Sequence, residues 1–152
     1  MKKILLTALL LFTLTMGMFS TANAAEQKIA TIDIQKVVSQ SAKVQALNKE
    51  QEKKILELEK WIEVVKKEVD KQQTQEGKEK LLNKYRTTYE QKKNSIIRDG
   101  QTKMQNIMNG ISDTIAAQAK AKGYTMIITK AVVVYGEEDI TDAVIKEINS
   151  KK

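Results

Sequence analysis

The sequence contains no cysteine, no histidine and no proline. The absence of cysteine excludes disulfides, thiolate metal sites and a lipid anchor attached to cysteine. Most nucleophilic and metal-based catalysis uses residues that are missing here, and no Gly-x-Ser-x-Gly turn, Walker loop or dinucleotide-binding glycine pattern occurs. The acidic residues stand mostly among lysines on predicted exposed helix faces, not as a catalytic pair. We therefore expect a protein that is not an enzyme and that has no catalytic residues, metal or cofactor.

The first 24 residues have the pattern of a targeting segment. Two lysines precede an apolar run over residues 4–14, and an Ala-Asn-Ala cleavage motif ends at Ala24. Threonines interrupt the run, which is shorter than the roughly 20 apolar residues of a membrane anchor. We expect cleavage after Ala24, which makes the mature chain a soluble exported protein.

Apolar residues recur at steps of three and four through most of residues 43–121, which places them on one stripe of a helix. One stripe consists of Ile55, Leu58, Ile62, Val65 and Val69, and a second, with gaps at Lys93 and Gly100, of Leu82, Tyr85, Tyr89, Ile96, Met104, Ile107, Ile111 and Ile115. The polar segment 72–77 between them contains a glycine and predicts a chain reversal. Two long helices folded back on each other would project as an arm of about 45 Å, at about 1.5 Å per residue.

A stripe this narrow suits a pair of helices and not a globular core. The same stripe is also typical of a dimer or trimer seam, and periodicity alone does not separate the two arrangements. Trp61, the only tryptophan, lies beside the first stripe and not on it. Its side chain either packs against the neighbouring helix or stays available to a binding partner.

Positive charge is concentrated in the second of these helices. Without the two lysines of the targeting segment the net charge of +7 becomes +5, and residues 78–103 hold eight basic side chains against three acidic ones. Such a field favours acidic partners and weakens with salt, which fits an anionic polymer, an acidic unfolded chain or a phospholipid surface. Nucleic acid is not expected as a partner, because an export signal directs the protein to a compartment without DNA.

The N-terminal end of the mature chain predicts a strand followed by a helix. Residues 28–33 have the composition of a short strand, and Asp33 is placed to cap the helical turn that follows. Ser39 or Ser41 then caps the long helix. This end packs with the C-terminal end in the predicted body.

The C-terminal end predicts two further strands and a final helix. Gly123 ends the second long helix, and residues 124–129 and 131–135 form the second and third strands. Asp139 caps the final amphipathic helix, and Asp142 completes a pair similar to a capping box. These acidic residues are therefore expected to have structural roles.

The run Val132 to Val134 is apolar without alternation, which indicates burial on both faces. Because three short strands do not make an adequate core alone, we expect subunits to share the sheet. The predicted oligomerisation residues are Ile29, Ile32, Ile127, Val132, Val133 and Val134. The expected fold class is α+β, with a long antiparallel helical hairpin over 43–121 that projects from a small oligomeric β-body built from 25–42 and 122–152.

This order of parts resembles the Skp/OmpH periplasmic chaperones of Gram-negative bacteria. The resemblance rests on three segments, Lys-Ile-Ala-Thr-Ile-Asp at 28–33, Ala-Val-Val-Val-Tyr at 131–135 and Asp-Ile-Thr-Asp-Ala-Val-Ile-Lys at 139–146. It covers the whole mature chain, and in the middle of the chain only the layout carries it.

The resemblance implies a Skp-like homotrimer in the periplasm, in which three helical arms on a β-body enclose a cavity. Such a protein holds unfolded outer-membrane proteins without ATP and prevents their aggregation in transit to the outer membrane. The client-binding residues would be Trp61, Lys78, Lys80, Lys84, Arg86, Lys92, Lys93, Arg98 and Lys103. The family also implies an anionic lipid or lipopolysaccharide surface as a partner, for which the sequence assigns no residues.

Two other functions are consistent with the same sequence. A structural or adaptor protein of the cell envelope would use the helical hairpin as a permanent interface with one folded partner. A cationic surface-binding protein would instead bind anionic vesicles in a salt-sensitive way, without any client.

Overall fold

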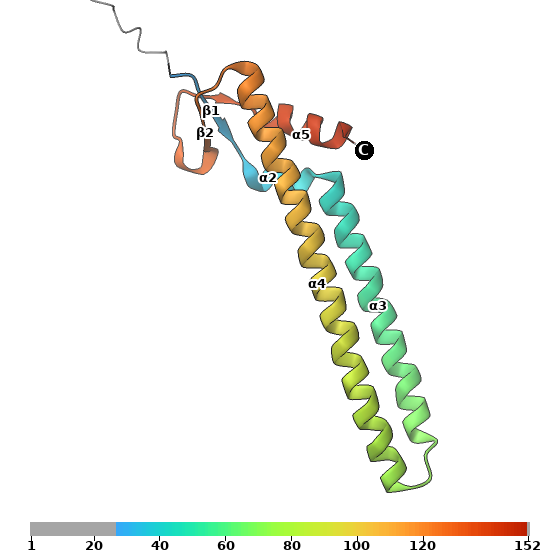
Figure 1. The fold of residues 1–152 in the computed structure, drawn as a ribbon. Coiled ribbons are helices and arrows are strands. Elements are labelled where there is room, and N and C mark those ends of the chain that lie inside the picture. Colours follow the sequence, from blue (N-terminus) through green and yellow to red (C-terminus); the bar gives the residue numbers. More distant parts are fainter. Residues whose placement is uncertain (1–26, 152) are drawn as a thin grey trace, which may run out of the picture.

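The computed structural model describes residues 27–151 and shows a small body from which two long helices extend side by side (Figure 1). The predicted targeting segment 1–24 lies outside the described residues. In chain order the elements are β1 (Ile29–Ile32), α2 (Ile34–Gln40), α3 (Ala42–Asp70), α4 (Gln75–Lys122), β2 (Met126–Thr129), the 3-10 helix η1 (Lys130–Val132), β3 (Glu138–Asp139) and α5 (Thr141–Ser150). The predicted combination of long helices with a small sheet is confirmed.

Side-chain caps and one glycine determine where the helices begin and end. Asp33 Oδ1 accepts a hydrogen bond from Lys36 N at 2.9 Å and caps α2, and Ser41, not Ser39, caps α3 by accepting from Val44 N at 3.5 Å. Gly123 has φ +71°, the left-handed conformation that glycine adopts most readily, and it ends α4. These caps are the ones that the sequence predicts.

The reversal between the long helices is shorter than predicted. It spans residues 71–74, because Thr74 accepts a hydrogen bond from Gly77 N at 3.1 Å and thereby starts α4 at Gln75. The glycine that the sequence places in the turn therefore belongs to the first turn of α4. Glycine generally marks a loop, but here the threonine cap determines where the helix begins.

The sheet has three parallel strands in the order β2-β1-β3. β1 pairs with β2 along its whole length, from Ile29 opposite Met126 to Ile32 opposite Thr129. On its other edge β1 pairs with β3 through Ala30 opposite Glu138 and Thr31 opposite Asp139. All three strands come from one chain, and the central one is the most buried.

The prediction of a third strand at 131–135 is wrong for the single chain. Residues 130–132 form η1, and the free edge of β1 is taken by Glu138–Asp139 instead. Without a strand to pair with, the apolar run stays outside the core: the exposed fraction is 72% for Val132 and 100% for Val134, although Val133 is half-buried. The burial on both faces that the sequence predicts is therefore not found within one subunit.

The hydrophobic core lies in the body, where the sheet, α2, α5 and the C-terminal part of α4 meet. It consists of Ala30, Ile32, Val37, Ile111, Tyr124, Ile140, Val144 and Ile148. Along the arm, burial is limited to a few α3 side chains near each end, Val44, Leu47, Val65 and Val69. The body therefore holds the fold together, while the arm is a thin two-helix structure with little buried area.

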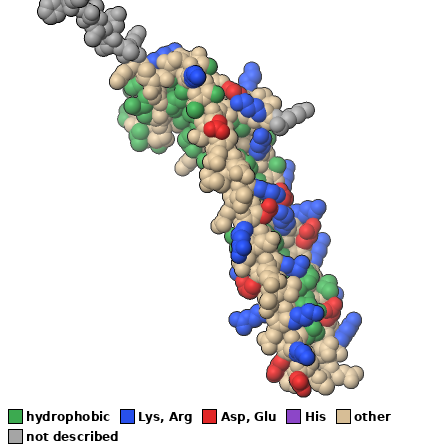
Figure 2. Space-filling model, viewed as in Figure 1, with side chains coloured by type: hydrophobic (Ala, Val, Ile, Leu, Met, Phe, Trp, Pro, Cys, Tyr) green, Lys and Arg blue, Asp and Glu red, His purple; other side chains and the backbone are tan. Residues whose placement is uncertain are grey.

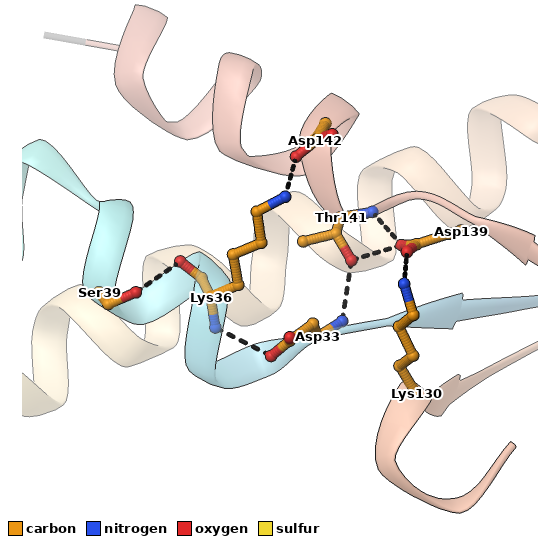
Figure 3. Close-up of polar contacts among 7 residues, drawn as sticks. All are labelled: Asp33, Lys36, Ser39, Lys130, Asp139, Thr141 and Asp142. Atoms are coloured by element: carbon orange, nitrogen blue, oxygen red, sulfur yellow. Dashed lines mark hydrogen bonds and ion pairs between the residues drawn. The ribbon is translucent and has the colours of Figure 1, made fainter.

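A chain of polar contacts fastens the N-terminal part of the body to α5 (Figure 3). The buried hydroxyl of Thr141 accepts a hydrogen bond from Asp33 N at 2.9 Å and donates one to Asp139. The Asp139 carboxylate also accepts from Thr141 N at 2.9 Å and from Lys130 Nζ at 2.7 Å. Lys130 and Thr141 together lower the pKa of Asp139 to about 2.

The predicted capping pair of Asp139 and Asp142 at the start of α5 is not found. The N-cap residue of α5 is Ile140, which makes no side-chain cap hydrogen bond, so the prediction that Asp139 caps this helix is wrong. Asp139 lies one residue earlier and accepts a hydrogen bond from the backbone N of Thr141, the first residue of the helix. Asp142 instead forms an ion pair with Lys36 Nζ of α2 at 2.8 Å, because α2 and α5 lie against each other in the body. Tertiary packing therefore gave Asp142 a partner that local spacing did not reveal.

Within residues 27–151, none of the helices combines the length and the apolar character that a membrane-spanning helix needs.

Candidate functional site

The candidate binding surface is the arm formed by α3 and α4. Figure 2 shows basic side chains scattered along this arm, and apolar side chains that gather on the body and in a smaller patch towards the tip of the arm. The contact between the helices is narrow: Val65 and Val69 are buried, but Ile55 and Leu82, two members of the predicted stripes, are 49% and 51% exposed. The seam between the helices is therefore partly open to solvent.

Trp61 lies at the contact between the two helices. Its ring meets that of Tyr85 edge to face, with 5.8 Å between the ring centroids and 80° between the planes, a favourable geometry for an aromatic pair. The Tyr85 hydroxyl donates a hydrogen bond to Glu68, and this carboxylate raises the pKa of Tyr85. Of the two positions that the sequence allows, Trp61 thus occupies the one against the neighbouring helix.

Trp61 also remains accessible from an open cleft of about 250 Å³ between the helices. The cleft has apolar walls from Leu58, Trp61 and Ile96, and its polar lining includes Lys54 and Lys92. Lys92 Nζ lies 5.6 Å from the centroid of the Trp61 ring, a distance typical of a cation–π contact. Glu57 also lines the cleft, and Lys54 is paired with Glu50 and Asp99. The surface therefore offers an apolar patch beside side chains of both charges, which suits weak contacts with many different chains.

A cluster of four charged residues joins α3 to α4 closer to the body; we call Glu50, Lys54, Asp99 and Lys103 the charge cluster. Lys54 Nζ lies 2.5 Å from Asp99 and 2.7 Å from Glu50, and Lys103 also contacts both carboxylates. The lysines lower the pKa of Glu50 and Asp99, and the carboxylates raise the pKa of both lysines. Lys103, predicted from sequence to bind a partner, is thus held in ion pairs within the chain.

Gly100 lies next to the charge cluster and explains one of the gaps in the second stripe. A Cβ atom at this position would stand 3.0 Å from Cδ of Gln51. The two helices therefore approach closely at Gly100, and a glycine provides the space. The sequence shows the gap but not the partner, because Gln51 is far away along the chain.

The other predicted basic residues do not gather at one site. Lys80, Lys84, Arg86, Lys92, Lys93 and Arg98 are exposed along α4, and Lys78 is half-buried near the tip. Their irregular spacing distributes them around the helix instead of along one face. They produce a positive field along the arm, not a discrete binding site.

Sequence reasoning missed several exposed apolar side chains. On the arm, Leu56, Val64 and Ile97 are 49%, 55% and 45% exposed, and they lie off the stripes by which the helices were recognised. On the body, Met126 and Tyr135 are 53% and 95% exposed, in addition to Val132 and Val134. An apolar residue outside the helical period was the signal that could have identified those on the arm.

The predicted oligomerisation residues fall into two groups. Ile32 is 3% exposed and belongs to the core of its own chain, and Ile29 and Ile127 are half-buried in the paired strands β1 and β2. Val132 and Val134, together with the half-buried Val133, lie in the segment that pairs with no strand. The second group is the one available to a neighbouring molecule.

Among residues 27–151, no group of three or more acidic side chains is arranged to hold a metal ion.

The comparison with protein families gives one match, which covers most of the chain. The family described as "Outer membrane protein (OmpH-like)" matches residues 28–148, from the start of β1 to the last turns of α5. Among curated proteins, none matches the chain.

Proposed function

The chain belongs to the OmpH-like family, a family of periplasmic chaperones for outer membrane proteins, and from this premise we propose that it is an ATP-independent holdase. It binds unfolded outer-membrane proteins in the periplasm and keeps them from aggregating until they reach the outer membrane. The main observation behind the proposal is the surface of the arm, where exposed apolar side chains lie among basic side chains.

The chemistry of the arm supports this proposal. An unfolded membrane barrel exposes apolar strands that must be shielded without being held in one conformation. Leu56, Val64 and Ile97 provide separate apolar contacts, and the basic side chains of α4 attract acidic segments over a longer range. Many weak contacts of this kind suit a client that must later be released. Because the sequence has no phosphate-binding loop, release follows from folding of the client at its destination.

The working form in this proposal is a homotrimer. Its support is the exposed apolar segment around Val132, Val134 and Tyr135, which a single chain leaves uncovered. Large exposed apolar patches on a soluble protein are typical of interfaces. In a trimer, three arms would surround one client.

The proposal predicts that the mature protein, in molar excess, suppresses aggregation of a urea-unfolded outer-membrane barrel after dilution, as measured by light scattering. Replacing Lys84, Arg86, Lys93 and Arg98 together by Gln is expected to weaken protection several-fold, most strongly at low salt, because the attraction is electrostatic. An undiminished aggregation signal with the unmodified protein would refute the holdase function.

The matched control removes the same charge from the other helix of the arm. Lys49, Lys53, Lys60 and Lys66 are exposed on α3, and their replacement by Gln is expected to weaken protection less. Equal losses in the two variants would show that net charge matters and that its position on α4 does not.

A further inference from the structure

A second cleft lies at the base of the arm, where α3 and α4 meet α5. It has a volume of about 270 Å³, its apolar lining comes from Ile107, Ile111 and Ile148, and Lys43 and Lys151 also line it. It is separate from the Trp61 cleft, with which it shares no residue. None of the predicted binding residues lines it.

This basal cleft continues along the arm into another of about 370 Å³. The two share Lys43, Asn106 and Ile107, and the second adds Leu47 and reaches the paired residues Glu50 and Lys103 of the charge cluster. Together they form a groove between α3 and α4, which we call the basal groove. An elongated groove with an apolar floor fits an extended chain better than a compact ligand.

Gly110 lines the basal groove, and no residue in the described part of the chain fills the space beside it. It lies inside α4, where glycine stabilises a helix less than alanine does. A Cβ atom at Gly110 would meet nothing within 4 Å, whereas at Gly100 it would press against Gln51. The helix therefore carries a costly residue whose space the subunit itself leaves empty. Gly110 is itself exposed, so the helix backbone is open to an external group at this point.

The charge around the groove indicates what kind of group this is. Lys151 is paired with Glu147 at 2.8 Å, and Lys103 is held in the charge cluster. Lys43 is exposed and forms no ion pair with any residue in the described part of the chain. It lines both halves of the groove, so an acidic group beside an apolar one would find a cation there.

We propose that the basal groove binds an extended segment of an unfolded client in which an apolar residue is next to an acidic residue. The apolar side chain lies over Gly110, between Ile107 and Ile148, and the carboxylate pairs with Lys43. This inference rests on the holdase function and adds to it a defined subsite with a preferred client sequence.

The probe is a blocked, dye-labelled peptide in which Leu alternates with Asp, titrated with the full mature protein and followed by fluorescence anisotropy. Gly110→Met fills the cleft and is expected to weaken binding at least tenfold. Lys43→Gln is expected to weaken it several-fold and to abolish the preference over a peptide in which Leu alternates with Asn. A peptide that alternates Ser with Asp lacks the apolar contact and is expected to bind poorly to every variant.

Matched controls separate binding from folding. Asn109→Ala changes an exposed neighbour that does not line the groove, and Lys49→Gln removes a similar exposed lysine from α3. Both are expected to bind the peptide as the unmodified protein does. Gly110→Ala is expected to raise the melting temperature of the protein and to weaken its binding of the peptide. Damage to the fold would not produce this combination.

Peptide binding that is unchanged in Gly110→Met, in a variant that folds at least as stably as the unmodified protein, would overturn the inference. If that variant instead alters the mass of the oligomer, the groove is an interface between copies of the chain and the inference is equally wrong. The light-scattering assay with a whole barrel decides the holdase function separately. If the protein prevents aggregation of the barrel but does not bind the peptide in the groove, the holdase function is supported and only the proposed subsite is wrong.

Discussion

At the scale of single residues, Asp139 shows how one side chain connects distant parts of the chain. Its carboxylate joins Lys130, which belongs to η1, to the first residue of α5, and Thr141 passes the connection on to Asp33. The sequence predicts Asp139 as a helix cap, whereas in the folded chain Asp139 lies one residue before the N-cap and forms an ion pair with Lys130. This extra partner is the main cause of the low pKa of Asp139, about 2 against an ordinary 3.8.

The low pKa of Asp139 predicts a dependence of stability on pH. A carboxylate with a lowered pKa in the folded state stabilises that state above its unfolded pKa, and this contribution disappears as the pH falls through the folded value. Asp139→Ala is therefore expected to lower the free energy of unfolding by about 1 kcal/mol at neutral pH, the usual net contribution of a hydrogen bond. The difference from the unmodified protein should narrow between pH 3.8 and about 2, as measured by urea unfolding.

Two variants complete this test. Asp139→Asn keeps an oxygen that can accept a hydrogen bond from Thr141 N and removes only the charge. Its free energy of unfolding should therefore fall less than that of Asp139→Ala. Asp142→Asn alters a carboxylate that is 83% exposed opposite Lys36 and should matter least. A gap between Asp139→Ala and the unmodified protein that stays constant down to pH 2 would contradict the role of the charge.

At the scale of elements, the arm is held together by a few contacts of different kinds. Val65 and Val69 bury apolar surface near the tip, Trp61 and Tyr85 form an aromatic pair near the middle, and the charge cluster lies closer to the body. Because little area is buried between these points, the helices should fray more readily than a packed bundle. In the proposed holdase, a thin arm of this kind would adapt to clients of different shape.

The charge cluster is expected to stabilise the arm more than an ordinary surface ion pair does. Its four charges form a network in which the side chains are only 31–41% exposed, and networks are where surface charges matter. Lys54→Gln should lower the melting temperature of the helical signal by a few degrees at low salt. In about 1 M NaCl, charges are screened over about 3 Å, so the difference in melting temperature between Lys54→Gln and the unmodified protein should become smaller.

The control for the charge cluster is the preceding residue. Lys53 lies 4.0 Å from Glu57, its side chain is 78% exposed, and Lys53→Gln should leave the melting temperature almost unchanged. If circular dichroism gives the same loss for Lys53→Gln and Lys54→Gln, the cluster contributes nothing beyond its net charge.

At the scale of the whole molecule, the core and the most exposed apolar side chains lie at the same end. The body contains the eight core residues around Val37 and Val144, and on its surface the segment after η1 leaves Val134 and Tyr135 almost fully exposed. The arm extends away from this end (Figure 1). In the proposed oligomer, subunits therefore associate through their bodies and leave the arms free.

Substitution of the exposed segment should separate assembly from folding. Val134→Asp combined with Tyr135→Ser changes side chains that are 100% and 95% exposed, so the subunit itself should keep its free energy of unfolding. Native mass spectrometry is expected to show a shift from trimer to monomer, because a charge would enter an apolar interface. As a control, Val64→Asp places a charge on the arm, where Val64 is 55% exposed, and should leave the mass unchanged. A trimer that survives the double substitution would exclude this segment as the interface.

The sequence by itself determined the local structure of this protein. Spacings of three and four predict the long helices, and Asp33, Ser41 and Gly123 mark helix ends because capping depends on residues within one turn. The excess of positive charge on α4 also follows from composition alone. The targeting segment, the trimer and the binding residues on the arm remain predictions.

Only the tertiary structure decided which distant segments meet. β1 pairs with Glu138–Asp139 and not with 131–135, Asp142 turns to Lys36, and Gly100 faces Gln51 while Gly110 faces an empty groove. The first three contacts join residues that are far apart in the chain, and at Gly110 the packing leaves open space. Such contacts depend on how the whole chain packs, because several arrangements satisfy the same local spacing and differ only in the sum of their long-range contacts.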